Sequence, residues 1–137
     1  MLKLIGYWGG GTFGGDDWIM PQDLVDPEWR SESHDALVRY LQSGKVALEY
    51  MGDSICRICG QPNGATEVTD GVWLWPEGLA HYVEAHNVRL PEAFASHASE
   101  NGFQIPPGLE DKNVDDAKKL QYDVSYWQNW CRANRRR

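Results

Sequence analysis

The sequence has only three cysteines in 137 residues, and an odd number cannot pair completely within one chain. This argues against a secreted scaffold held together by disulfides. No apolar run approaches the roughly 20 residues that a membrane-spanning helix needs. The opening MLKLIGYWGGG has one lysine and a brief apolar stretch, which does not match a signal peptide. We therefore expect a reduced, cytoplasmic protein without a membrane span.

Positive charge is also scarce, with 13 Lys and Arg against 20 Asp and Glu, and the net charge is −7. Residues 112–137 carry a net charge of +4, so residues 1–111 carry −11. An acidic body argues against broad nucleic-acid binding, which depends on contacts from Lys and Arg to phosphates. A basic protein partner would suit this charge distribution better.

The length and hydropathy pattern predict a single α+β domain over residues 1–137. Apolar residues at helical spacing predict amphipathic helices at about 27–43 and 115–132. Between them, TEVT and VWLW flank Asp70-Gly71, a dipeptide typical of two-residue hairpin turns. The other predicted elements are a strand in KLIGYW, a strand over 46–52, and two helices that begin at Pro76 and Pro91.

Cys56 and Cys59 are followed, after 21 residues, by His81 and His86 in the pattern C-x2-C-x21-H-x4-H. Two thiolates and two imidazoles make a complete tetrahedral ligand set for Zn²⁺. The thiolates also balance the charge of the ion, so the site can be partly buried without an unpaired charge. The sequence therefore predicts a zinc site formed by these four residues.

The order of the predicted elements agrees with this site. A cysteine turn, a hairpin and a helix with two histidines predict a treble-clef or ββα-like zinc-binding core over residues 54–97, flanked by amphipathic helices. His81 and His86 would lie about 140° apart on an ideal helix, so we expect the helix to loosen at its end. An alternative is that His97 replaces His86 as the fourth ligand.

Two other interpretations of the cysteine pair remain open: a redox motif and a chance occurrence. A thioredoxin-like pair opens a helix, whereas GQPNG after Cys59 does not favour one. A catalytic zinc keeps one position open for water, and a complete four-ligand set leaves none. HYVEAH also lacks the HExxH order, and Glu84 is interpreted as a solvated helix residue. We expect a structural metal, and a buried free thiol at Cys131.

The segments CRICG and NGATEVTDGVWLWPEGLAHYVEAHNVRLPEAF resemble the core of uncharacterised small bacterial proteins. The similarity covers residues 18–97. It implies a cytoplasmic bacterial protein with a zinc-knuckle-like centre, and it assigns the ligand role to Cys56, Cys59, His81 and His86. It implies no activity.

Three functional hypotheses follow, and the first is a protein-interaction module whose architecture is fixed by zinc. An immunity protein or another inhibitor of a basic toxin or enzyme would have this character. Its candidate partner-binding rings lie in the glycine- and aromatic-rich segment 1–26 and are Trp8, Phe13 and Trp18, with core packing as the alternative role for each. The alternatives are a zinc-finger nucleic-acid-binding regulator and a metal-dependent hydrolase.

Each alternative lacks a feature that it requires. A nucleic-acid-binding regulator needs a basic face, and only the C-terminal helix and basic tail at 114–137 offer one. A hydrolase needs an open metal position or a set of catalytic side chains. No Ser-His-Asp arrangement, carboxylate pair or cofactor fingerprint is visible, so we expect no enzyme activity.

Overall fold

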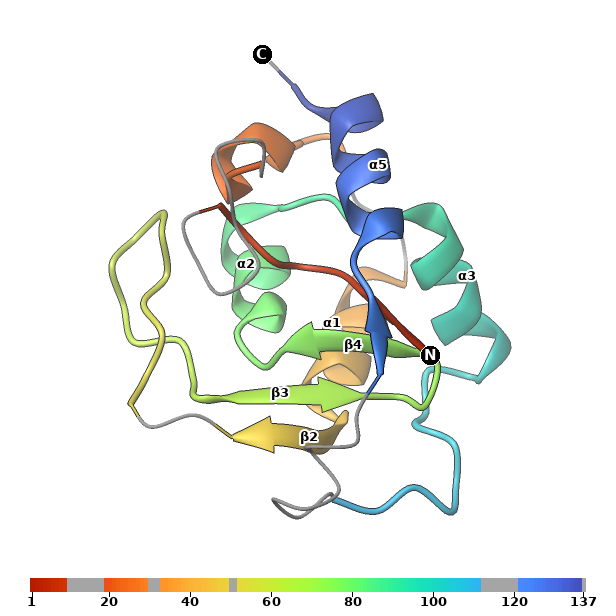
Figure 1. The fold of residues 1–137 in the computed structure, drawn as a ribbon. Coiled ribbons are helices and arrows are strands. Elements are labelled where there is room, and N and C mark those ends of the chain that lie inside the picture. The colour runs from red at the N-terminus through yellow and green to blue at the C-terminus, as the bar shows by residue number, and fades with distance from the viewer. Residues whose placement is uncertain (10–18, 30–32, 50–51, 112–120, 137) are drawn as a thin grey trace.

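The computed structural model describes residues 1–9, 19–29, 33–49, 52–111 and 121–136. Within these residues, five strands form one sheet in the order β2-β3-β4-β1-β5 (Figure 1). Strand β3 is antiparallel to both β2 and β4, whereas β1 is parallel to both β4 and β5. The strands are β1 (Leu2–Leu4), β2 (Lys45–Glu49), β3 (Thr66–Thr69), β4 (Trp73–Pro76) and β5 (Tyr122–Asp123).

The helices pack around this sheet, and α1 lies behind it between α2 and α3 (Figure 1). The fold is a small α+β single domain, as the sequence predicts. None of the described helices has the length and apolar character needed to cross a bilayer. The helices are α1 (His34–Gln42), α2 (Leu79–His86), α3 (Glu92–Glu100) and α5 (Ser125–Asn134), and a short 3-10 helix, η1, covers Pro21–Leu24.

Aromatic side chains from β4 form the centre of the core. Trp73 and Trp75 project to the same face of the strand, because alternate residues do so. Both rings pack edge-on against Phe94 of α3, at centroid distances of 5.6 and 5.4 Å. The indole of Trp75 also donates a hydrogen bond to the carbonyl oxygen of Leu41 at 3.0 Å. These contacts fix α1 and α3 against β4.

The predicted hairpin is present, but its turn is longer than two residues. Strand β3 ends at Thr69 and β4 begins at Trp73. The carboxylate of Asp70 explains the difference, because its Oδ1 accepts hydrogen bonds from the backbone N–H groups of Val72 (2.9 Å) and Trp73 (2.8 Å). Such a side-chain turn competes with the two-residue geometry that Asp70-Gly71 alone would favour.

The other oxygen of the same carboxylate joins the hairpin to two helices. Asp70 is only 2% exposed, and its Oδ2 accepts a 2.6 Å hydrogen bond from the hydroxyl of Tyr40 in α1. The Nε2 atom of His97 in α3 lies 3.3 Å from the same oxygen. Asn101 adds a hydrogen bond from its Nδ2 to the Tyr40 hydroxyl at 3.1 Å. We call Tyr40, Asp70, His97 and Asn101 the buried polar network.

Helices α1 and α2 begin later than the sequence predicts. The helix predicted from about residue 27 begins at His34 in the described chain, and Pro27 lies in a turn. The helix predicted from Pro76 begins at Leu79. Pro76 is instead the last residue of β4, where it pairs with Glu67. Proline suits a strand end as well as a helix start, so hydropathy spacing could not separate the two.

The last helix, α5, begins at Ser125, ten residues after the predicted start. Residues 112–120 lie outside the described residues. Tyr122 and Asp123 pair with β1 as a short strand, so residues 122–123 are not helical. The Asp123 carboxylate accepts hydrogen bonds from the backbone N–H and hydroxyl of Ser125, at 2.9 and 2.7 Å. These bonds cap the first turn of α5 and mark the point where the chain leaves the sheet.

Candidate metal centre

The two cysteines lie in a narrow loop between β2 and β3. Ile55 and Pro62 form an isolated antiparallel bridge that closes the loop. Inside it, the backbone N–H of Gly60 donates to the carbonyl oxygen of Cys56 at 2.9 Å. Gly60 has a φ of 78°, a left-handed conformation that glycine adopts without strain. The backbone N–H of Cys59 points at the Cys56 sulfur, 3.5 Å away, as expected for a metal-binding cysteine turn.

The two histidines lie at opposite ends of α2, which widens at its C-terminus. The N–H groups of Asn87 and Val88 both bond to the carbonyl oxygen of Tyr82, and Asn87 has a φ of 50°. These bonds span five and six residues, whereas an α-helical bond spans four. These bonds end the helix directly after His86, whose ring lies at a centroid distance of 5.0 Å from that of His81. The expected loosening of the helix is confirmed.

Loop and helix bring all four predicted ligands together. The Nε2 atom of His81 lies 3.4 Å from the Cys59 sulfur, and that of His86 lies 3.6 Å from the Cys56 sulfur. All four ligand atoms are within 4.8 Å of one another. Bonds of about 2.3 Å to sulfur and 2.0 Å to nitrogen in a tetrahedral zinc site place a sulfur and a nitrogen ligand about 3.5 Å apart. The four side chains can therefore hold one metal ion.

Hydrogen bonds and burial favour the metal-binding forms of two ligands. Burial opposes ionisation of Cys56, which is 1% exposed, but hydrogen bonds lower the thiol pKa overall. These bonds come from the backbone N–H groups of Cys59 and Ile58, from the Cys59 side chain and from the hydroxyl of Tyr82. Burial, and then the neighbouring His81, lower the pKa of His86. A thiolate and a neutral imidazole are the forms that coordinate metal. Because the lowered pKa values already favour these forms, fewer protons must be released when a metal ion binds.

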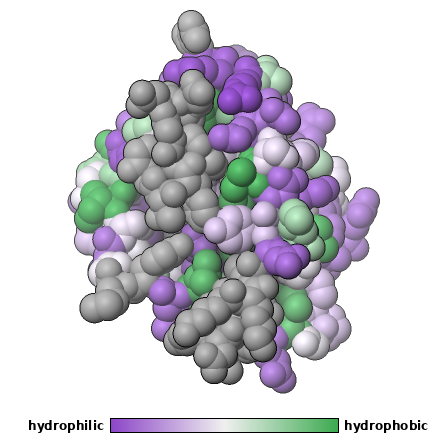
Figure 2. All heavy atoms as spheres, viewed as in Figure 1, coloured by the Kyte–Doolittle hydropathy of each residue, from purple (hydrophilic) through white to green (hydrophobic). Residues whose placement is uncertain are grey.

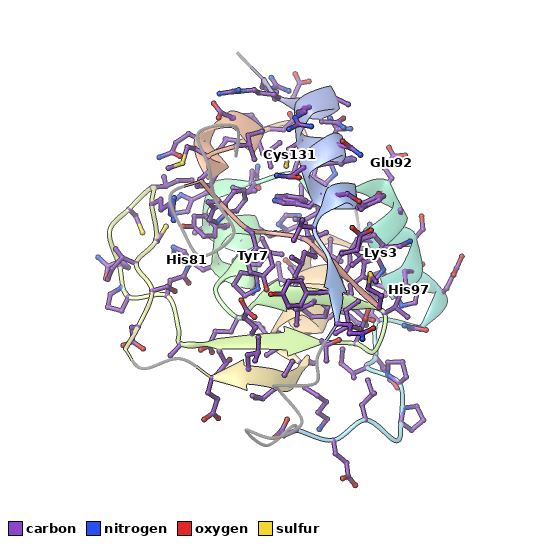
Figure 3. The ribbon with its side chains drawn as sticks, in the orientation of Figure 1. Lys3, Tyr7, His81, Glu92, His97 and Cys131 are labelled. Atoms are coloured by element: carbon purple, nitrogen blue, oxygen red, sulfur yellow. The ribbon has the colours of Figure 1, made fainter. Side chains whose placement is uncertain are left out.

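The alternative fourth ligand, His97, takes no part in this cluster. His81 and His97 lie on opposite sides of the domain (Figure 3). His97 instead contacts the carboxylate of Asp70 within the buried polar network. His86, the last residue of α2, completes the set, since its Nε2 atom lies 3.6 Å from the Cys56 sulfur.

The structure describes one of the three predicted partner-binding rings. Trp8 is only 9% exposed and packs edge-on against Tyr82 and Trp127, at centroid distances of 5.4 and 5.7 Å. Trp8 therefore packs in the core between α2 and α5 and does not offer an exposed ring to a partner. Phe13 and Trp18 lie outside the described residues. Cys131 is buried in α5 as expected, and burial raises the pKa of its thiol.

The sequence reasoning missed the residues that support the ligands. The hydroxyl of Tyr82 bonds to Cys56 and also accepts a 2.8 Å hydrogen bond from the backbone N–H of Arg57. Oε1 of Glu77 accepts hydrogen bonds from the N–H groups of Ala65 (2.6 Å) and Thr66 (3.1 Å), where the chain leaves the loop. Tyr82 directly follows the first histidine, but an aromatic residue in a helix more often signals only the core.

We expect Tyr82→Phe to weaken metal binding about tenfold, because removing a partner of a ligand typically costs ten- to a hundredfold in metal affinity. The substitution removes the hydroxyl that stabilises the Cys56 thiolate and holds Arg57 in the loop. Competition with a chromophoric zinc chelator would measure the change. Tyr126→Phe is a matched control, because Tyr126 packs on Trp73, away from the site. Equal affinity of both variants would contradict the supporting role of Tyr82.

No protein-family model, curated protein or solved structure matches the chain. The similarity to small bacterial proteins therefore stays a prediction. The description of the fold and of the metal centre rests on the chain's own residues: two cysteines in a closed loop, and two histidines on one helix, within reach of one ion.

Proposed function

We propose that the chain is a small zinc protein whose structural site is formed by Cys56, Cys59, His81 and His86 in a treble-clef-like core. The observation that carries this proposal is the pair of sulfur-to-nitrogen distances, 3.4 and 3.6 Å, that suit tetrahedral zinc. Thiolates together with imidazoles favour zinc over the hard cations, which prefer oxygen ligands.

A structural role suits the position of the site. Four protein ligands leave no open coordination position, so the ion would not present water or substrate. It would instead tie the loop at residues 54–64 to both ends of α2. That helix packs against α1 and supports Trp8 in the core. The metal would thus fix the surface formed by the loop at residues 54–64 and α2, and would not take part in a reaction.

We further propose that this surface binds a basic protein partner, as an immunity or inhibitor protein for a basic toxin or enzyme would. Residues 1–111 carry a charge of −11. Two arginines of the basic tail are already paired: Arg135 contacts Asp23 at 3.4 Å and Arg136 contacts Asp26 at 3.1 Å. This pairing reduces the basic face that a nucleic acid would need. Hydrophilic side chains gather around α5 near this end of the chain (Figure 2).

Two measurements test the proposal. Elemental analysis of untagged protein should find one zinc per chain. Calorimetry should detect binding of a peptide of alternating arginine and glycine, and no binding of its citrulline analogue, which has the same shape without the charge. Binding should weaken with added salt, because screening reduces attraction between exposed charges. Absence of zinc would contradict the metal assignment, and equal binding of the two peptides would contradict the basic-partner assignment.

A further inference from the structure

A cleft of about 430 Å³ lies beside the metal centre. Its walls come from the end of α1, from β2 and β3, and from α2, whose residue His81 is both a metal ligand and part of the wall. The volume is within the usual range for sites that bind small groups. The apolar side chains in its lining are Leu41, Val46, Val68 and Ala80.

Two carboxylates, from Glu77 and Glu84, complete the polar part of the lining together with Gln42 and Thr66. Oε1 of Glu77 is held by the two backbone N–H groups at the loop exit, so the carboxylate has a fixed position. Within the described part of the chain, no ion pair neutralises Glu77 or Glu84. Among the described residues, no lysine or arginine lines the cleft. In that part of the chain, the cleft therefore combines an apolar wall with negative charge that no ion pair balances.

We propose that this cleft receives an arginine side chain of the basic partner, an inference that rests on the proposed function. An arginine has an apolar stem that packs against aliphatic walls while its charged end stays at a polar rim. Its planar guanidinium offers several N–H donors in a fixed geometry, which suits two carboxylates better than the single ammonium of lysine. The acidic body would attract such a partner from a distance.

This assignment also gives the metal a role in partner binding. His81 and Glu84 are three residues apart and so lie on one side of α2. Glu77 lies just before the helix, and its hydrogen bonds hold the residues that follow the cysteine loop. An ion bound by His81 would therefore keep the helix, the loop exit and both carboxylates in one arrangement.

The test uses the zinc-loaded full chain and Nα-acetyl-arginine methylamide as the probe. Titration followed by amide chemical shifts should show binding with an affinity on the order of millimolar, as expected for a ligand of this size. The shifts should map to the cleft. The citrulline derivative should not bind, and the lysine derivative should bind more weakly.

The variant Glu77→Gln with Glu84→Gln removes both charges while preserving side-chain shape, and it should weaken probe binding about tenfold. The matched control, Glu92→Gln with Glu100→Gln, removes the same charge from α3. Glu92 lies on the opposite side of the domain from His81 (Figure 3), and both control residues are exposed. The control should bind the probe as tightly as the unsubstituted chain.

Other results would overturn the inference. Equal affinity of the cleft variant and the α3 variant would do so, as would equal binding of the lysine and arginine derivatives. If the unsubstituted chain binds the arginine–glycine peptide while the cleft variant binds it just as well, the cleft assignment fails and the proposed function stands. If the unsubstituted chain does not bind that peptide, the proposed function fails as well.

Discussion

Replacing Cys56 with alanine should lower the melting temperature of the zinc-loaded protein by about 15 °C. The metal stabilises the folded chain by its binding free energy, because the four ligands are not assembled in the unfolded chain. Structural zinc contributes about 10–16 kcal/mol in isolated zinc-finger peptides. Here the chain also has an aromatic core around Trp75 and Phe94 that contains none of the four ligands. We therefore expect a smaller loss of about 5 kcal/mol, at about 3 °C per kcal/mol for this length.

Cys131→Ala provides the matched control, because Cys131 is a second buried cysteine that lies in α5 and not in the cluster. This substitution leaves a small cavity, so it should lower the free energy of unfolding by about 1 kcal/mol. The variant should keep its zinc. A chelator should lower the melting temperature of the unsubstituted protein and of the control, and should leave that of Cys56→Ala unchanged. A metal-loaded protein whose melting temperature does not respond to chelation would contradict a structural metal.

The four candidate ligands could be predicted from the sequence because their spacing along the chain is typical of a zinc site. Cysteines three positions apart share a turn, and histidines five positions apart share one ion most easily near the end of a helix. Asn87, in a left-handed conformation, ends the helix directly after His86. The sequence ruled out neither His86 nor His97, because the choice depends on where α3 lies, and β4 and the buried polar network determine its position.

Local sequence patterns were less informative where contacts between distant residues determine the end of an element or the burial of a side chain. Proline at position 76 fits a helix start and a strand end equally well, and only its pairing with Glu67 settles the matter. Trp8 follows a short strand and precedes glycines, a position that fits both a core ring and a partner-binding ring. It packs between Tyr82 and Trp127, from distant parts of the chain. Contacts over such separations leave no periodic signal in the sequence. The supporting role of Tyr82 was hidden for the same reason.

Asp70→Ala should destabilise the protein by about 4 kcal/mol without loss of zinc. The carboxylate accepts two backbone hydrogen bonds in the hairpin turn and one from Tyr40, and it contacts His97. Alanine would leave the Tyr40 hydroxyl and the backbone N–H of Trp73 buried without this acceptor. Burial first, and then the hydrogen bond to Asp70, raise the pKa of Tyr40, so its hydroxyl keeps its proton and remains a donor.

Urea denaturation followed by tryptophan fluorescence would measure this loss, with zinc content determined on the same samples. Asp53→Ala is the matched control, since Asp53 is exposed, and it should change stability by less than about 0.5 kcal/mol. Asp70→Asn should fall between the two, because the amide oxygen can still accept from Val72 and Trp73 while its NH₂ group faces the Tyr40 hydroxyl. If alanine at position 70 were tolerated as well as alanine at position 53, the hairpin would not depend on this carboxylate. Loss of zinc from Asp70→Ala would instead show that the buried polar network and the metal centre form one cooperative unit.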